Sequence, residues 1–454
     1  MNGPPSADRR RWVLLTVGIG TFMSALDGSA VNTVLPLLRR ELHTSVAGIE
    51  WVATVYLLVV SGLLLPFGRA GDLYGQKRVY LLGFALFVAA SALCGLAPSA
   101  PALVALRGLQ GVGAAMLFAS APAILTRTFP AARRGRALGV QGMMTYLGLT
   151  TGPALGGWIA HTFGWRWVFY INVPIGLLAA TLAARLIREE RGAATREPFD
   201  LAGGALFLAG LVALLVALNQ GHAWGWTAPA TLGLATTAAA LLATFVAVER
   251  RRASPMLDLA LFRDRTFAAS ALSAYLNYVC VYGVVFTIPF LLVQGRGLDT
   301  RHAGLVLTAQ PLVMAAVAPL SGALSDRVGT RPPATAGMLV LAAGLLLLAR
   351  AAAGPSLAAV AAALAVVGLG VGTFVSPNNS ALMGAAPRAR QGTAAGVLAT
   401  ARNVGMASGI GLAGAILTTY LARGGTQALV PGVQASLYVA AALAALGAFA
   451  SWLR

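Results

Sequence analysis

The sequence is poor in charged residues, and within that small set it is especially poor in acids and lysine. Only 10% of its 454 residues are charged, against roughly 25% in soluble proteins, whereas 58% are hydrophobic. This composition excludes an ordinary soluble globular protein and indicates lipid as the main solvent. The two cysteines, Cys94 and Cys280, both lie in apolar runs, so we expect no disulfide framework.

Patterns for nucleotide-driven or enzymatic chemistry are missing as well. The single lysine, Lys77, is followed by Arg78, so the chain has no Gly-x4-Gly-Lys-Ser/Thr phosphate loop. No apolar run carries paired carboxylates or a histidine cluster. We therefore expect no enzymatic activity, no metal and no cofactor.

The chain does contain long apolar runs, fourteen in number, each near the roughly 20 residues that a helix needs to cross a bilayer. No polar segment between them is long enough to form a soluble domain. We predict an all-α integral membrane protein with transmembrane helices over residues 12–35, 48–68, 79–98, 101–125, 137–160, 165–187, 200–219, 227–248, 267–293, 302–324, 333–351, 356–383, 391–421 and 433–453.

The net charge of +19 would suggest a nucleic-acid partner in a soluble protein, but the positions of the basic residues give a better account. Cytoplasmic loops of membrane proteins carry an excess of Lys and Arg. With a cytoplasmic N-terminus, the outer side receives only Arg39, Arg40, Arg166, Arg296, Arg301, Arg350 and Arg423. We predict that both termini are cytoplasmic, that the chain contacts anionic lipids, and that it binds no nucleic acid.

A short motif, Gly-x3-Asp-x2-Gly-x-Lys/Arg, occurs after the second span and again after the tenth. Two matched copies suggest duplicated halves. Each is predicted to be a cytoplasmic gating loop, in which the cations pair with the aspartate across a closing seam. Ordinary basic decoration of a cytoplasmic loop is the alternative. The predicted gating residues are Asp72, Gly75, Lys77, Arg78, Asp326, Arg327 and Arg331.

Together with these loops, five further segments resemble the major facilitator superfamily, in its fourteen-helix drug:proton antiporter branch. They are residues 26–36 (with Ser29 where Thr is usual), 107–111, 148–157, 165–176 and 255–267. The resemblance covers nearly the whole chain. It implies two six-helix bundles, over residues 1–192 and 253–454, around a central cavity, with residues 193–252 as an inserted helix pair.

The segment in the fifth span carries Gly148, Gly152, Pro153, Gly156 and Gly157. The glycines remove side chains along one face, and the proline breaks the helical hydrogen-bond ladder, so this helix can bend and pack closely. The resemblance implies an antiporter helix that blocks leak and biases the cycle toward export. Ordinary packing of small residues between helices is the alternative.

Two opposite charges lie at matching depth in the first and fourth spans. Asp27 is roughly 22 Å from the cytoplasmic end of its span and Arg107 roughly 9 Å from the outer end of its own, at 1.5 Å per residue. Both therefore occupy one layer of a core about 30 Å thick. We predict that Asp27 carries the coupling proton and that Arg107 tunes it. A static ion pair between two helices is the alternative.

Other polar groups in the spans are candidates for a substrate cavity. Arg402 has no carboxylate at its depth, so it serves helix packing, a gate or contact with an anionic group. Each of the remaining candidates can instead be a hydrogen bond between helices or part of the core. The candidates are Asn32, Tyr56, Gln110, Met144, Tyr146, Asn277, Tyr278, Gln310, Asn378 and Arg402.

These features predict a proton-coupled antiporter that exports drugs, antibiotics or related apolar small molecules by alternating access. No acid lies inside spans nine to fourteen, so a neutral or zwitterionic cargo fits at least as well as a cation. An uptake symporter, a dedicated exporter of one metabolite and a signalling protein of the same fold are the alternatives. We expect a monomer in the inner membrane of a bacterium, with protons, a small-molecule substrate and lipids as its partners.

Overall fold

The computed structural model describes residues 7–188, 198–252 and 254–454, and this part of the chain is helical with no strand. The predicted boundary between residues 192 and 193, and the start of the last unit at residue 253, lie outside the described residues. We call α1–α7 the first half. Its helices are α1 (Ala7–Glu41), α2 (Val46–Tyr74), α3 (Gln76–Gly95), α4 (Ala100–Thr128), α5 (Ala131–Phe163), α6 (Arg166–Tyr170) and α7 (Asn172–Leu186).

Two further groups of helices follow. The inserted pair consists of α8 (Leu201–Trp224) and α9 (Pro229–Glu249). We call α10–α16 the second half, which a 3-10 turn at Leu259–Arg263 precedes. Its helices are α10 (Arg265–Phe290), α11 (Thr300–Leu307), α12 (Ala309–Val328), α13 (Arg331–Ala353), α14 (Leu357–Ala385), α15 (Gln391–Gly424) and α16 (Leu429–Trp452).

Thirteen helical stretches in the described residues are long and apolar enough to cross a membrane. The remaining long helix is α5, which has 33 residues but is absent from that set. Its basic first turns and its many glycines and threonines lower its hydropathy. Packing between α1 and α12 replaces lipid as its surroundings.

Three predicted spans are not single α-helices. The span over 165–187 is divided into α6 and α7, and the span over 302–324 into α11 and α12. Pro174 and Pro311 follow these breaks, and neither can donate the backbone hydrogen bond that would join the two pieces. The span over 267–293 ends in a π-helical turn, Leu291–Gly295, which begins two residues after Pro289.

The predicted gating loops are almost entirely helical, so their description as loops is wrong. Asp72 lies in α2 and Asp326 in α12, and each helix continues to the glycine of its motif. Gly75 and Gly329 have φ values of 102° and 86°, a conformation that other residues rarely adopt. The glycine at the end of each helix therefore allows the turn to the next helix to be only one or two residues long.

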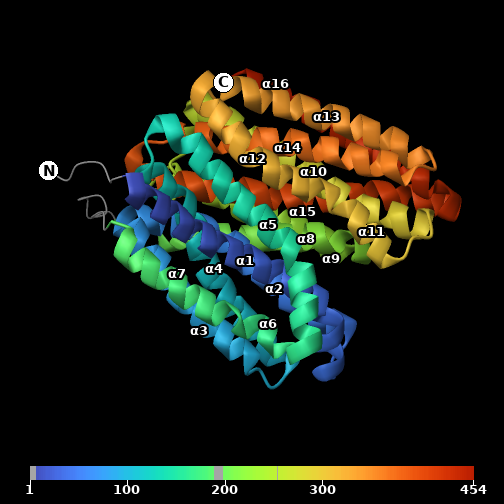
Figure 1. Ribbon diagram of the computed structural model, residues 1–454, viewed down its shortest axis with the longest axis horizontal. Coiled ribbons are helices and arrows are strands. Elements are labelled where there is room, and N and C mark those ends of the chain that lie inside the picture. Colours follow the sequence, from blue (N-terminus) through green and yellow to red (C-terminus); the bar gives the residue numbers. More distant parts are fainter. Residues whose placement is uncertain (1–6, 189–197, 253) are drawn as a thin grey trace.

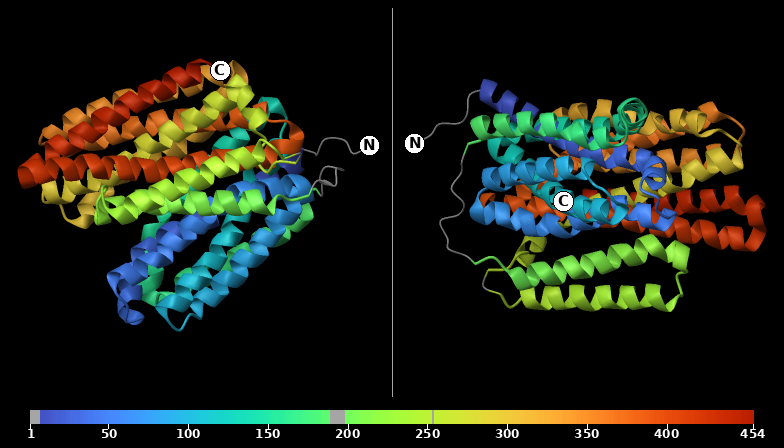
Figure 2. Two further views of the ribbon diagram at one scale, coloured as in Figure 1. Left: turned by 180° about the vertical axis from the view of Figure 1, so that it is seen from behind. Right: turned by 90° about the horizontal axis from the view of Figure 1, so that it is seen from below.

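The halves are joined where long helices of one pack against long helices of the other. In the first half α5 packs against α1, and it also packs against α12 of the second half, while α2 packs against α15. The inserted pair packs on itself, and α8 contacts α2 and α15 (Figure 2). The pairs α5–α12 and α2–α15 thus hold the two halves together.

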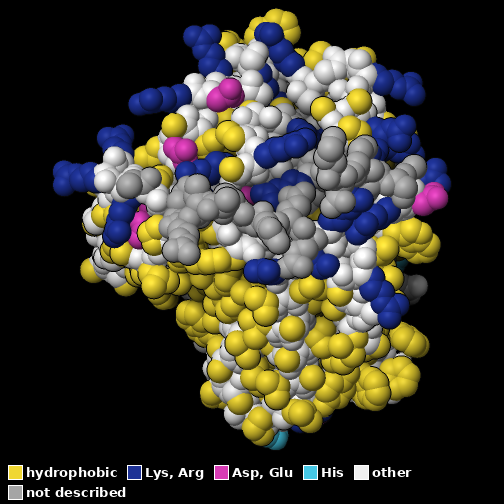
Figure 3. Space-filling model, turned by 90° about the vertical axis from the view of Figure 1, so that its left-hand side faces the viewer, with side chains coloured by type: hydrophobic (Ala, Val, Ile, Leu, Met, Phe, Trp, Pro, Cys, Tyr) yellow, Lys and Arg dark blue, Asp and Glu magenta, His cyan; other side chains and the backbone are white. Residues whose placement is uncertain are grey.

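The start of α1 and the end of α16 lie at the same end of the molecule, toward the left of Figure 1. Figure 3 looks onto this end and shows Lys and Arg side chains gathered across it, with few acids among them. We call it the basic end. The halves meet there and diverge toward the opposite end in Figure 1. This asymmetry is the one that the distribution of arginines predicts.

Candidate functional site: a buried carboxylate network and two helix clasps

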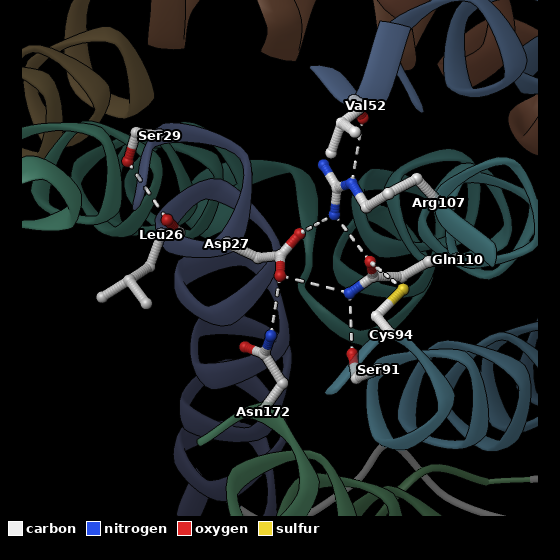
Figure 4. Close-up of polar contacts among 9 residues, drawn as sticks. All are labelled: Leu26, Asp27, Ser29, Val52, Ser91, Cys94, Arg107, Gln110 and Asn172. Atoms are coloured by element: carbon white, nitrogen blue, oxygen red, sulfur yellow. Dashed lines mark hydrogen bonds and ion pairs between the residues drawn. The ribbon is translucent and has the colours of Figure 1, made fainter. Parts of the chain in front are cut away.

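A buried carboxylate lies at the centre of the first half, on α1. Asp27 is 0% exposed, and α4 places Arg107, which is 1% exposed, directly against it. Arg107 Nη1 donates to Asp27 Oδ2 over 2.7 Å (Figure 4). The contact that the depths of the two residues predict is therefore confirmed, and it is direct.

The other carboxylate oxygen is also fully engaged. Asp27 Oδ1 accepts hydrogen bonds from Asn172 Nδ2 at 2.7 Å and from Gln110 Nε2 at 3.1 Å. Figure 4 shows these donors converging on the carboxylate from α4 and α7. Because all of the described partners are N–H donors, the arrangement suits the ionised form of Asp27, which is an acceptor only.

A second set of contacts fixes the donors themselves. Arg107 Nε donates to Val52 O at 3.2 Å, and the Arg107 guanidinium lies 4.0 Å from the centroid of the Tyr56 ring. Gln110 Oε1 accepts from Arg107 Nη1 at 2.6 Å, and Gln110 Nε2 also donates to Ser91 Oγ at 2.7 Å. Groups on α1, α2 and α3 thus hold Arg107 and Gln110 of α4 in place.

Adding a proton to Asp27 would disturb this arrangement. A protonated carboxyl carries an O–H group that needs an acceptor, and the three side chains around it present N–H groups instead. Neutralising Asp27 would also leave the buried cation of Arg107 without its counter-charge. Protonation of Asp27 would therefore require this packing of α1, α4 and α7 to rearrange.

Sequence reasoning missed two members of the network. Asn172 lies in the segment that resembles the start of the sixth span, but nothing in its pattern shows that it faces Asp27. Ser91 on α3 is an ordinary small polar residue in an apolar run. Only the packing of α3 and α7 around α1 and α4 brings them to the site.

At the basic end, Asp72 connects the first half to the second. Its carboxylate accepts hydrogen bonds from the backbone of Gly392 at 2.8 Å and of Thr393 at 2.7 Å, both in the first turn of α15. Such amides lack partners within their own helix, and the helix dipole favours a negative charge there. Arg127 also pairs with Asp72 at 2.9 Å.

Asp326 makes the reciprocal connection from the second half. Its two oxygens accept from the backbone of Gly135 at 2.8 Å and of Arg136 at 2.9 Å, near the start of α5. We call these two contacts the α15 clasp and the α5 clasp. Each half uses the aspartate of its repeated motif to hold the beginning of a helix in the other half.

Lys77 and Arg331 of the motifs contact groups other than these aspartates, which corrects that part of the sequence prediction. Lys77 donates to Ala184 O at 2.7 Å, and Arg331 lies over the Trp452 ring at 4.3 Å. Arg78 and Arg327 are exposed. Backbone amides from across the seam supply the donors instead, and Arg127, on α4 of the same half, pairs with Asp72.

A basic pocket of about 490 Å³ lies beside the α15 clasp. Its walls come from α1, α3, α4, α5 and α7, with Arg388 from the second half. The cations that line it are Arg9, Arg10, Lys77, Arg127, Arg134, Arg188 and Arg388. Burial and the nearby charge of Arg388 lower the pKa of Arg134 from its usual value.

Three glycines of α5 lie in close contact with α1. A Cβ atom added to Gly152 would lie 1.8 Å from Ser29 Oγ, and one added to Gly156 would lie 2.7 Å from Ala30 Cβ. Gly148 likewise meets the backbone of α1, whereas Gly157 faces open space apart from Thr33 at 3.9 Å. Pro153 is exposed. Glycine thus lets α5 approach the part of α1 that carries Asp27.

The predicted cavity residues fall into three groups. Asn277 and Asn378 are fully buried and bonded within the second half, to Met338 and to Ser270 and Arg454 respectively. Gln110 belongs to the Asp27 network. The others lie on helices of both halves, with Asn32 exposed and the rest buried or half-buried: Asn32, Tyr56, Met144, Tyr146, Tyr278, Gln310 and Arg402.

Comparison with known proteins identifies the family. The Major Facilitator Superfamily profile matches residues 17–410 and 270–454. The chain belongs to the Major Facilitator Superfamily. It is 36% identical over 409 residues to the "Multidrug resistance protein Stp" of Mycobacterium tuberculosis, with 90% of this chain and 76% of that protein covered.

Two further comparisons concern a relative of similar length and a solved structure. The chain is 33% identical to the "Riboflavin transporter RibZ" of Clostridioides difficile, with 97% and 96% of the two chains covered. It superposes on the human organic anion transporter MFSD10 with a TM-score of 0.72 at 19% identity, over 99% of this chain and 100% of the other. The protein is therefore a multi-pass membrane transporter and not an enzyme, and the family resemblance of its motifs is confirmed.

Proposed function

We propose that this transporter is a proton-coupled exporter of largely apolar small molecules, drugs and antibiotics among them. The observation that carries the proposal is the Asp27 carboxylate, which is fully buried and held by three N–H donors. An ionisable group at such a position is a functional candidate by default, because burying it is unfavourable. The relative Stp, which is 36% identical to this chain, is named as a multidrug resistance protein.

The proposed cycle links the Asp27 network to the two clasps. In the conformation described here the clasps hold the basic end together, and we take that end to be cytoplasmic because its arginines follow the positive-inside rule. Proton entry at Asp27 breaks the Arg107 contact and loosens α1 from α4. Motion of α1 reaches α5 through their glycine contacts, and α5 carries the α5 clasp.

The orientation has consequences for location and partners. We propose that the protein lies in the inner membrane of a bacterium, as a monomer, with both termini cytoplasmic. Anionic lipid headgroups are then natural neighbours of the basic end. The proton gradient supplies the energy, without a cofactor. One charge moved through 100 mV is worth about 2.3 kcal/mol.

A drug-susceptibility panel in a host that lacks its own pumps, followed by transport in reconstituted vesicles, tests the proposal. Under an imposed pH gradient the most strongly exported drug is expected to move opposite to the protons, and its addition should dissipate the gradient. Drug movement in the same direction as protons would overturn antiport, and movement that ignores the gradient would overturn proton coupling.

A second candidate is the transport of one dedicated metabolite. The full-length similarity to a protein named as a riboflavin transporter favours it. The same panel separates the two, because a dedicated transporter protects its host against few or none of the drugs. The vesicle assay with riboflavin then gives the direction of transport.

A further inference from the structure

Arg402 is a second cation in the membrane interior, and its surroundings differ from those of Arg107. It lies about 17 Å along α15 from the start of that helix, at 1.5 Å per residue. Arg402 Nε donates to Asn403 Oδ1 at 3.2 Å, and the guanidinium lies 5.4 Å from the Phe118 ring on α4. Asn403 in turn donates to Ser61 Oγ on α2 at 2.8 Å. Arg402 therefore lies at the seam between the halves.

The charge of Arg402 is not neutralised by any residue that the structure describes. It forms no ion pair there, and its two terminal nitrogens make no hydrogen bond to a described residue. The acids of the second half, Asp264, Asp299 and Asp326, all lie at helix ends. An uncompensated cation inside a membrane is costly, whereas a bound anion would offset that cost.

Aromatic side chains lie close to this cation and to Arg107. The Phe118 ring on α4 is 5.4 Å from the Arg402 guanidinium, and the Tyr56 ring on α2 is 4.0 Å from the Arg107 guanidinium. The Tyr56 hydroxyl is buried and has no hydrogen-bond partner among the described residues.

We propose that Arg402 binds the substrate's anionic group, and that the preferred cargo is an aromatic molecule with one carboxylate, sulfonate or phenolate. This inference rests on the proposed function, since it names the substrate class of that same transporter. The rings supply stacking surfaces, and the guanidinium supplies the one strong polar contact. The anion site at Arg402 and the proton site at Asp27 lie in different halves, so the cargo and the proton bind to separate groups.

Anionic cargo changes the energetics of export. A cycle that imports one proton and exports one monovalent anion moves two elementary charges, whereas the same cycle with neutral cargo moves one. Each is worth about 2.3 kcal/mol per 100 mV. The negative interior of a cell therefore favours this cycle through two charge movements, the entry of the proton and the exit of the anion.

A matched pair of fluorescent probes tests the proposal. The anion 8-anilinonaphthalene-1-sulfonate and neutral N-phenyl-1-naphthylamine share a ring system and differ by the sulfonate. The purified full-length protein is expected to bind the sulfonate at least about tenfold more tightly, in line with a charge-assisted hydrogen bond of about 1.5–3 kcal/mol. Arg402→Gln should abolish this preference, and Arg402→Lys should retain part of it.

Arg423→Gln is the matched control, because Arg423 lies exposed on the same helix. It should leave both affinities unchanged. Unchanged binding of the neutral probe by Arg402→Gln shows that this variant is folded. Equal affinity for both probes in the native protein, or a preference that survives Arg402→Gln, would overturn the inference and indicate that Arg402 only links helices.

The inference and the proposed function fail in different ways. If drug export follows the proton gradient but the sulfonate has no preference, then the anion site is wrong and the antiporter stands. If the Arg402-dependent preference is present but no transport responds to a proton gradient, then the anion site stands and the coupling is wrong.

Discussion

At the basic end the two halves of the molecule hold each other in the same manner. Asp72 accepts from the first turn of α15, and Asp326 accepts from the start of α5. In the membrane interior the halves differ, because Arg107 is neutralised by Asp27 whereas Arg402 faces no described carboxylate. The repeated part is the clasp, and the unequal part is the basis of our two proposals, a proton site at Asp27 and an anion site at Arg402.

The largest effect is expected from breaking the neutralised pair. Arg107→Gln leaves the Asp27 carboxylate buried without its cation, which costs about 3–5 kcal/mol. Arg402→Gln removes a cation that has no ion-pair partner among the described residues, so its cost should stay within about 1 kcal/mol. The free energy of unfolding in mixed detergent measures both. Equal losses in the two variants would contradict the difference between the halves.

The next effect concerns the clasps. Asp72→Asn removes the charge from hydrogen bonds worth about 1.5–3 kcal/mol each, and Asp326→Asn does the same in the other half. Hydrogen–deuterium exchange should rise at the start of α15 in the first variant and at the start of α5 in the second. Asp8→Asn, an exposed acid at the same end, serves as the control. If neither helix start exchanges faster, the clasps do not hold the basic end closed.

A smaller effect is expected where α5 touches α1. Gly152→Ala places a Cβ atom 1.8 Å from Ser29 Oγ and 3.1 Å from Ala30 N, so α5 must shift at a cost of about 1–3 kcal/mol. Gly157→Ala, one turn along, has only Thr33 at 3.9 Å and should be neutral or stabilising. Thermal unfolding compares the pair. Similar midpoints would show that α5 and α1 are not closely fitted at Gly152.

The smallest effect is expected at Tyr56, whose ring lies against Arg107. Tyr56→Phe removes a hydroxyl that lacks a partner among the described residues but keeps the ring on Arg107, so stability should change by no more than about 0.5 kcal/mol. Tyr56→Leu also removes the ring and should cost about 1–2 kcal/mol through the lost cation–π contact. A larger loss in the phenylalanine variant would show that the hydroxyl is bonded in the protein.

Periodic and local features of the sequence predict most of the fold. Long apolar runs indicate the helices, and the distribution of arginines indicates the asymmetry of the two ends. Helix depth alone brings Asp27 and Arg107 to one layer. The helix α5 shows the limit of hydropathy, because its glycines are placed for contact with α1 and α12 rather than with lipid.

The partners of the site depend on contacts that no local pattern encodes. Asn172 reaches Asp27 from 145 positions away, and Thr393 reaches Asp72 from 321 positions away. The clasps use backbone amides, which every residue except proline possesses, so residue identity gives no signal. Which cation pairs with which acid likewise follows from packing, as the contact of Asp72 with Arg127 shows.

The central claim is that Asp27 couples transport to protons, and Asp27→Asn in reconstituted vesicles tests it most directly. With the drug that the panel shows to be exported most strongly, one proton through 100 mV can sustain a concentration ratio of about 50. The account predicts that Asp27→Asn sustains no such ratio but still exchanges drug for drug across the membrane. A variant that concentrates the drug against its gradient as the native protein does would contradict the account.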